Sequence, residues 1–227
     1  MVLVPEARFM ARFIKESEAI EGIYVNEKEI YESLLRGDDL DYVGAFTRLF
    51  REIRYGNFFL TREIICDTQR LIVENQHKRG ERKLLKKYVG AFRDIPVSIG
   101  GELRFPDCIS NAIQELVLDA NEWLESWFLP AHERVQRIAD FHFYFENIHP
   151  FADGNGRTGR ALVYALFKNF RMTPFIFTNC DKHETYYRCF RRKEDMRLYF
   201  KIRAERAEEE YTQIQKEYEK NGMLDFS

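Results

Sequence analysis

Apolar residues recur every three or four positions along most of this 227-residue chain, which is the spacing of an amphipathic helix. Only 12 glycines and 6 prolines interrupt the pattern, and no repeat is present. The periodicity predicts helices over residues 8–21, 26–35, 41–54, 61–75, 108–127, 131–147, 156–171, 183–192 and 196–219. We therefore expect a mostly helical domain, with the last, highly charged helix lying along the surface.

One segment departs from the helical pattern. In residues 92–107, Val97 and Ile99 alternate around Ser98 and are followed by two glycines. Alternation that ends in a glycine pair is typical of a short β-hairpin. An irregular loop between two helices is the alternative.

The overall composition limits the possible partners. The chain is 45% hydrophobic and 32% charged, as in globular proteins, and its net charge is −2. A near balance of 35 basic and 37 acidic residues argues against binding to a nucleic acid backbone. The basic segment 78–87 is expected to be a solvated helix face.

The cysteines and the N-terminal segment suggest a compartment. None of the four cysteines forms a pair at zinc or redox spacing, so reduced thiols are the simplest interpretation. The N-terminal segment has scattered charges and no apolar run typical of a signal peptide or membrane span. We expect a cytoplasmic protein without a membrane partner.

Residues 148–160, "IHPFADGNGRTGR", carry the strongest chemical signal. Pro150 disfavours a helical conformation at the preceding His149, so the chain is expected to leave a helix there. It then loops and enters the next helix near Asn155. The loop and the start of that helix would lie side by side.

The second half of this stretch is suited to bind phosphates. Gly154 and Gly156 flank Asn155, and glycines permit unusual backbone angles and the close approach of a ligand. Consecutive N–H groups at a helix start bind anions. Arg157 and Arg160 lie three residues apart on the same helix, and their forked donors suit phosphate oxygens. Several phosphates are therefore predicted.

The remaining polar residues suggest a reaction. Asp153 beside a polyphosphate would be repelled unless a cation such as Mg²⁺ lay between them. His149 has an ordinary pKa of about 6.5 and can accept a proton from an attacking hydroxyl near neutral pH. Phe151 is expected to anchor the loop in the core. These residues together predict transfer of part of a nucleotide to a hydroxyl.

Each of these residues alone has an ordinary structural explanation, such as a loop histidine, a glycine turn or an exposed arginine. Their combination is specific. The segment "HPFADGNGR" with Arg160 fills every position of the motif H-P-F-x-D/E-G-N-G-R-x-x-R, so the chain resembles the Fic (filamentation induced by cAMP) family. The preceding "FHFYFENI" and the hairpin around residues 97–101 also resemble that family.

The resemblance implies an all-α fold with one hairpin, called the flap, and transfer of AMP from ATP to a Ser, Thr or Tyr hydroxyl of a protein. It implies an N-terminal helical arm (1–80), a Fic core (81–200) and a charged C-terminal helix (201–227). Mg²⁺ or Mn²⁺ would be the metal. A target would add to the flap as an extended strand, and a homodimer is possible.

Residue roles also follow from the resemblance alone. His149 would be the base, and Asp153 would bind the metal. The nucleotide would contact Asp153, Gly154, Asn155, Gly156, Arg157, Thr158, Gly159, Arg160, Ile99, Gly100, Gly101 and Tyr187. A branch with lysine at position 156 transfers phosphate, and Gly156 favours AMP. The family's adenine-side asparagine is replaced by Glu194, which leaves the base identity open.

A second motif lies near the N-terminus. "SEAIEG" places Ser17 and Glu21 on one helix face and Gly22 after them. A glutamate in the last helical turn is disfavoured by the helix dipole, so a cationic partner would stabilise it. An exposed glutamate before a capping glycine is the ordinary alternative. The segment resembles the inhibitory motif S/T-x-x-x-E-G/N of the Fic family, which implies that Glu21 pairs with Arg160 and blocks ATP.

Three functions remain open from the sequence. The first is an autoinhibited AMP-transferase that acts on proteins. The second is removal of AMP, with Glu21 positioning water, or transfer of another phosphate-linked group at the same site. The third is a nucleotide-binding module without catalysis, against which the intact His149 and Asp153 argue.

Overall fold

The computed structural model describes residues 4–38, 41–54, 58–79, 84–99, 101–126, 128–180 and 182–220. Its helices, in chain order, are α1 (Val4–Ile20), α2 (Glu27–Arg36), α3 (Asp41–Arg54), α4 (Arg62–Arg79), α5 (Ile109–Leu124), α6 (Ala131–Ile148), α7 (Asn155–Asn169), α8 (Lys193–Glu205) and α9 (Ala207–Lys220). Two 3₁₀ turns cover Lys86–Tyr88 and Tyr186–Arg191, and the strands are β1 (Val97–Ile99) and β2 (Glu102–Arg104). The predicted all-α fold with one hairpin is confirmed.

Local sequence signals explain several element ends. Asn26 caps α2 by accepting a hydrogen bond from the Lys28 amide at 2.9 Å, and Gly37 ends that helix in the left-handed conformation. β1 and β2 pair antiparallel, with Ile99 opposite Glu102, and Gly101 lies in a turn before β2 with φ 88°. The hairpin prediction was therefore right, and the loop alternative was wrong.

Two predicted helices near the C-terminus differ in the structure. Residues 186–191 form a 3₁₀ turn, because Tyr186 is drawn into the core against Phe177, with ring centroids 5.1 Å apart. The single surface helix predicted at 196–219 is two helices separated at Arg206, and both bury one face. Their charged residues hide a buried stripe that contains Phe200 and Tyr218.

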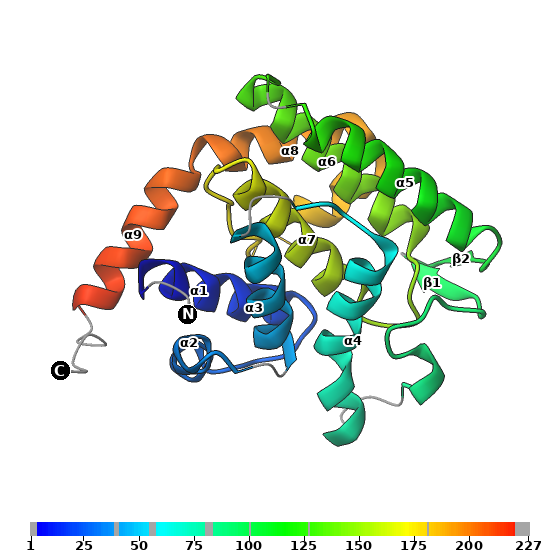
Figure 1. Cartoon of the computed structure of the whole chain (residues 1–227), viewed down its shortest axis with the longest axis horizontal. Helices are drawn as coiled ribbons and strands as arrows, with labels where there is room; N and C mark the ends of the chain where they lie inside the picture. The colour runs from blue at the N-terminus through cyan, green and yellow to red at the C-terminus, as the bar shows by residue number, and fades with distance from the viewer. Residues whose placement is uncertain are drawn as a thin grey trace.

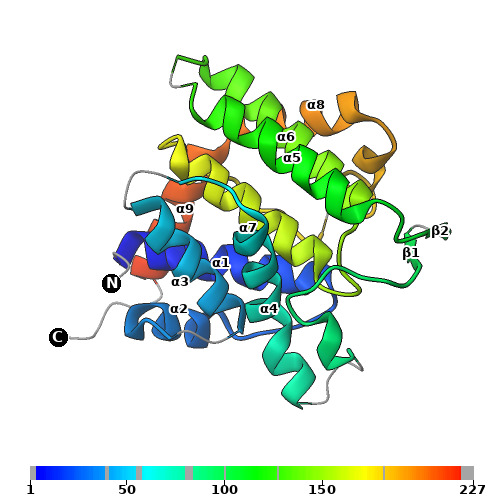
Figure 2. The ribbon, with the colours of Figure 1, turned by 45° about the vertical axis from the view of Figure 1, so that its right-hand side comes forward.

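Helix α7 occupies the centre of the molecule. Figures 1 and 2 both show it between the green pair α5 and α6 on one side and the blue and cyan helices α1, α3 and α4 on the other. Its residues from Ala161 to Phe167 are all buried. The hairpin lies at the edge of the molecule, beyond the start of α7 (Figure 2). Because α7 is enclosed, only its two ends can reach solvent.

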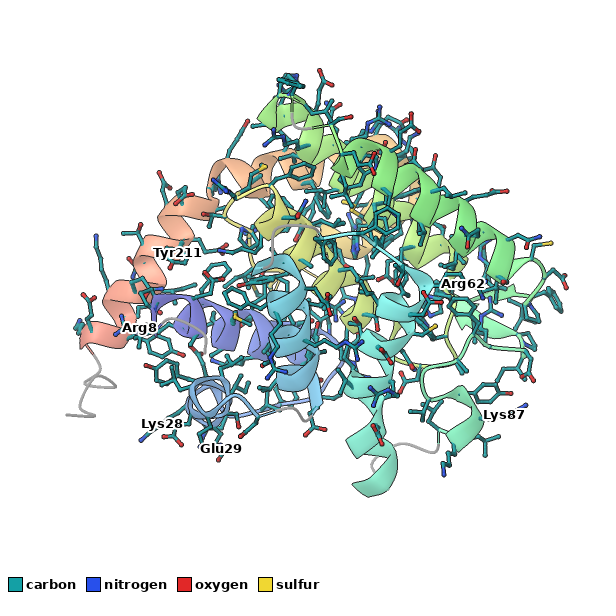
Figure 3. All side chains as sticks on the ribbon, in the orientation of Figure 1. Arg8, Lys28, Glu29, Arg62, Lys87 and Tyr211 are labelled. Carbon is teal, nitrogen blue, oxygen red and sulfur yellow. The ribbon has the colours of Figure 1, made fainter. Side chains whose placement is uncertain are left out.

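The N-terminal helix α1 is part of the same hydrophobic core. Phe13 is 1% exposed, and its ring lies 5.2 Å from that of Tyr164 on α7. At the other side of α1, Arg8 donates to Gln215 of α9 at 3.2 Å, and Phe9 lies 5.3 Å from the Tyr211 ring. Figure 3 shows Arg8 and Tyr211 along this contact between α1 and α9.

None of the helices in the described ranges is long and apolar enough to cross a membrane. Within those ranges, no cluster of three or more His, Cys, Asp or Glu side chains is arranged to hold a metal ion.

The packing of α1 predicts a large effect of shortening Phe13. Phe13→Ala should lower the free energy of unfolding by about 3–5 kcal/mol, because it removes a fully buried ring among other rings. Denaturant titration followed by circular dichroism measures this. Phe128→Ala, at a position that is 100% exposed, is the matched control and should change stability by less than about 0.5 kcal/mol. Equal effects would contradict the placement of α1.

Candidate active site at the start of the central helix

A cavity of about 940 Å³ opens at the N-terminal end of α7. Its size lies at the upper end of the range for small-molecule sites. It is surrounded by the hairpin, the end of α6, the loop 149–154, the start of α7, the 3₁₀ turn 186–191 and Glu21 after α1. Its lining includes Glu21, Ser98, Ile99, Glu146, Asn147, His149, Asp153, Gly154, Asn155, Gly156, Arg160, Tyr186, Tyr187, Arg188 and Arg191.

His149 lies at the end of α6 with its backbone in the left-handed region, at φ 51°. Its Nδ1 is 3.3 Å from the Glu146 carbonyl oxygen, which can only accept, so Nδ1 carries the hydrogen of the neutral ring. The pKa of His149 falls to about 4, chiefly because of burial. Nε2 is therefore left unprotonated and can accept a proton at neutral pH.

Glu146 is a buried carboxyl beside this histidine, and the sequence analysis did not single it out. Its Oε2 is 4.0 Å from His149 Nδ1, and among the described residues Oε1 has no hydrogen-bond partner. Burial raises the pKa of Glu146 to about 8, although the nearby Arg160 opposes the shift. The carboxyl is therefore mostly protonated at neutral pH. A glutamate three residues before a base was the available sequence signal.

The Asn155 side chain closes the loop itself. Its Oδ1 accepts from the Phe151 amide at 2.8 Å, and its Nδ2 donates to the Phe151 carbonyl at 2.8 Å. This reciprocal pair uses both ends of the carboxamide. Asn155 thus shapes the loop, and Phe151, which is 0% exposed, anchors it as predicted.

The three glycines of the segment 148–160 serve different purposes. Gly154 has φ 82°, which other residues rarely adopt. A Cβ on Gly156 would lie 2.6 Å from Glu21 Oε1, and one on Gly159 would lie 2.3 Å from Glu146 Oε1. Gly154 therefore permits the turn, whereas the other two leave room for neighbouring carboxyl groups.

Arg160 is 1% exposed and is held by α1. Its Nε donates to Ser17 Oγ at 2.8 Å, and its Nη2 donates to the Ser17 carbonyl at 2.9 Å and to Glu21 Oε1 at 2.9 Å. The predicted contact between Glu21 and Arg160 is present. Gly22 follows with φ 76° and ends the turn after α1. The carboxylate thereby occupies the end of the cavity beside Gly156.

Arg157 and Arg160 do not point to the same place. Arg157 is fully buried, does not line the cavity, and lies 3.5 Å from Glu18 Oε2. Tyr42 donates to the Arg157 carbonyl at 2.6 Å, so Ser17 must be the donor in its 2.8 Å bond with Tyr42. The predicted direct phosphate contact of Arg157 is not favoured by this geometry.

Asp153 lines the cavity with a partly exposed side chain. Its Oδ1 accepts from the Gly154 amide at 2.8 Å, and its Oδ2 is 3.8 Å from Arg157 Nη2. A single carboxylate together with phosphate oxygens is a common Mg²⁺ ligand set. The donor set therefore fits a metal that arrives with a nucleotide.

Other predicted contacts vary in position. Ile99 and Tyr187 line the cavity, but Gly101, Thr158 and Gly159 do not. The Thr158 hydroxyl is buried in the helix, which keeps it away from a ligand in the cavity. Gly100 lies outside the described residues. Glu194 is exposed in the first turn of α8 and is not part of the lining.

Comparison with known proteins agrees with this geometry. Residues 59–167 match the Fic/DOC family. This region of the chain is therefore similar to the Fic/DOC family. The matched region contains the hairpin, α5, α6 and most of α7, and hence the loop with His149 and the start of the central helix.

Curated relatives that are similar to part of this chain are named as protein adenylyltransferases. "Protein adenylyltransferase fic-1" of Caenorhabditis briggsae is 30% identical over 38% of this chain and 17% of its own length. "Protein adenylyltransferase Fic" of Nematostella vectensis is 36% identical over 29% of this chain and 16% of its own length. The chain thus spans less than a fifth of these relatives.

Solved Fic structures share the fold over nearly the whole chain. A Fic domain containing signaling protein from Bacteroides thetaiotaomicron has a TM-score of 0.73 at 19% identity, covering 93% of this chain and 89% of its own. Fic-1 from C. elegans has a TM-score of 0.67 at 17% identity, covering 94% of this chain and 64% of its own. The likeness extends beyond residues 59–167.

Because the pKa of the buried Glu146 is raised, this residue should make the folded state less stable as pH rises, whereas a carboxylate with a lowered pKa makes it more stable. As pH rises from about 4.5 to 8, the unfolded chain ionises at this position and the folded chain does not, so stability is lost. Glu146→Gln should therefore gain about 1–4 kcal/mol relative to wild type between pH 5 and pH 8. Denaturant titrations at both pH values measure this. Glu115→Gln, on the exposed face of α5, should show no such gain. If the free energies of unfolding of Glu146→Gln and wild type changed equally between the two pH values, Glu146 would not be neutral in the folded chain.

Proposed function

We propose that the chain is a protein adenylyltransferase that transfers AMP from ATP to a Ser, Thr or Tyr hydroxyl and is held inactive by Glu21. One observation carries the proposal: a neutral His149 and the open start of α7 line the same cavity. The relatives named as protein adenylyltransferases support the same activity.

The proposed chemistry divides between these residues. His149 Nε2 takes the proton of the target hydroxyl as its oxygen attacks the α-phosphorus of ATP. The new oxygen–phosphorus bond forms as the bond to the β-phosphate breaks, and pyrophosphate leaves. The N–H groups at the start of α7 and the Arg160 guanidinium would stabilise the phosphates. A divalent cation held by Asp153 would neutralise phosphate charge.

The proposed autoinhibition follows from the position of Glu21. Its carboxylate is bonded to Arg160 and lies where a terminal phosphate would meet that guanidinium. Two anions cannot share this partner without repulsion, so ATP would bind in a displaced position or not at all. Ser17 accepts from Arg160 Nε and also from the same Nη2 that donates to Glu21, so the guanidinium would keep two bonds to α1 when Glu21 is removed.

The exposed edge of the flap is suited to a peptide partner. All three residues of β2 are exposed, and Leu103 is 64% exposed beside the cavity-lining Glu102 and Arg104. A strand with unpaired edge groups can add an extended segment of another protein. We therefore propose that the target docks there.

Removal of AMP from a modified protein is the alternative that one contact favours. Glu21 lines the same cavity as His149, so its carboxylate could orient a water molecule for attack. Wild-type chain that releases AMP from an AMP-modified protein, but transfers none from ATP, would support this alternative.

Removing the inhibitory carboxylate tests the proposed regulation. Glu21→Gly should incorporate label from α-labelled ATP, in the presence of Mg²⁺ or Mn²⁺, at least tenfold faster than wild type. Acceptors are the chain itself and the proteins of a cell lysate, resolved by electrophoresis. Glu29→Gly, at an exposed position on α2, is the control and should behave as wild type. Equal rates for Glu21→Gly and wild type would refute autoinhibition.

The base is tested in that released background. His149→Ala in the Glu21→Gly chain should lower the labelling rate by about 10²–10⁴-fold, because no other group replaces the proton acceptor. Binding of a fluorescent ATP analogue should change little, since the phosphate-binding end is left intact. Full labelling by the double variant would exclude His149 as the base.

A further inference from the structure

Arg93 is a buried cation at the root of the hairpin, in the loop before β1. It is 4% exposed, and among the described residues no carboxylate lies within ion-pair distance of it. A buried charge without a paired anion is costly unless hydrogen bonds satisfy it. Such a position calls for an explanation in terms of what the guanidinium holds.

The guanidinium of Arg93 bonds only to backbone carbonyl groups, and these come from separate segments. Its Nε donates to the His149 carbonyl at 2.8 Å. Its Nη1 donates to Ile95 at 2.7 Å and Arg104 at 3.0 Å, and its Nη2 donates to Phe105 at 3.2 Å. One planar group therefore joins both ends of the hairpin to the loop that carries the base.

The Arg93 backbone adds a second hydrogen bond to the loop that carries the base. Its amide donates to the Pro150 carbonyl at 2.9 Å. Two consecutive carbonyl groups, those of His149 and Pro150, are thus tied to one residue at the point where the chain leaves α6 in the left-handed conformation. This fixes the backbone of the base relative to the hairpin.

The hairpin needs such an anchor. Its two strands are three residues each, and a two-stranded hairpin is only marginally stable in water by itself. A target segment added to its edge would be placed no better than the hairpin itself. Misplacement by about 1 Å between reacting groups can cost about a hundredfold in rate.

We infer that Arg93 is a positioning residue for AMP transfer, which sets the distance between the hairpin that carries the target hydroxyl and the base that deprotonates it. The inference rests on the proposed function for its catalytic consequence. Arg93 acts on the backbone and not on the reacting atoms, because four of its five side-chain N–H donors are engaged by backbone carbonyls.

The charge of Arg93 has a separate effect on His149. The groups that face His149 are Glu146 on α6, Glu21 after α1, Asp153 in the loop and Arg93. Arg93 lowers the pKa of His149, whereas Glu21 and Asp153 raise it. Geometry and charge can therefore be separated, because Arg93→Lys keeps the charge but loses the four-carbonyl contact, whereas Arg93→Gln loses both.

The first test measures labelling with α-labelled ATP in the Glu21→Gly background, on the chain itself and on lysate proteins. Arg93→Gln should lower the maximal rate about a hundredfold, with the half-saturating ATP concentration changed less than twofold. Arg93→Lys keeps the charge, but one ammonium group cannot span four carbonyls, so its rate should stay at least tenfold low. Arg62→Gln, whose parent guanidinium lies over the neighbouring Phe92 ring at 5.4 Å, is the matched control and should leave the rate unchanged (Figure 3).

The second test does not need activity. In Arg93→Gln, amide hydrogen exchange should accelerate at least tenfold in both residues 97–104 and the loop after Pro150, with core amides of α7 such as Leu162 unaffected. The pKa of His149, followed by NMR, should rise in Arg93→Gln and stay low in Arg93→Lys. Unchanged exchange in either segment, or equal acceleration in α7, would overturn the inference. If Glu21→Gly transfers no AMP, the proposed function fails, and the exchange result alone decides whether Arg93 joins hairpin and loop.

Discussion

The buried charge of Arg160 is the constraint on which the arrangement of this site depends. A guanidinium that is 1% exposed must have its donors satisfied, and the groups that satisfy it are Ser17 on α1 and Glu21 just after it, 143 and 139 residues away in sequence. Ser17 and Glu21 can do this only if α1 lies against α7. The charge balance of the cavity therefore depends on the position of α1.

This constraint explains why the N-terminal helix is built into the core. Phe9 and Phe13 place two buried rings between α7, α9 and the rest of the interior. A helix anchored by that much apolar surface does not separate from the domain at low cost. Relief of the proposed inhibition would therefore require a local change at Glu21, which is partly exposed, and not the removal of α1 as a unit.

The sequence predicted the fold class, the hairpin and the contact of Glu21 with Arg160, because each depends on local spacing or on a motif with a fixed meaning. It did not predict that the Asn155 side chain would form hydrogen bonds with both the amide and the carbonyl of Phe151. It also did not predict the ion pair of Arg157 with Glu18. Those outcomes depend on which helix packs beside the loop, and spacing within one segment does not encode that. The prediction of one surface helix over residues 196–219 was wrong for a similar reason. The chain forms two helices that separate at Arg206, and the many charged residues made their buried faces hard to recognise in the sequence.

Gly159, which does not line the cavity, is constrained by Glu146, which does. Its missing Cβ leaves the space that Glu146 Oε1 fills, and the two residues lie on different helices. A larger side chain at 159 would require a shorter one at 146, and the reverse exchange would open a void beside the base. The residues at positions 146 and 159 should therefore covary in size among aligned relatives.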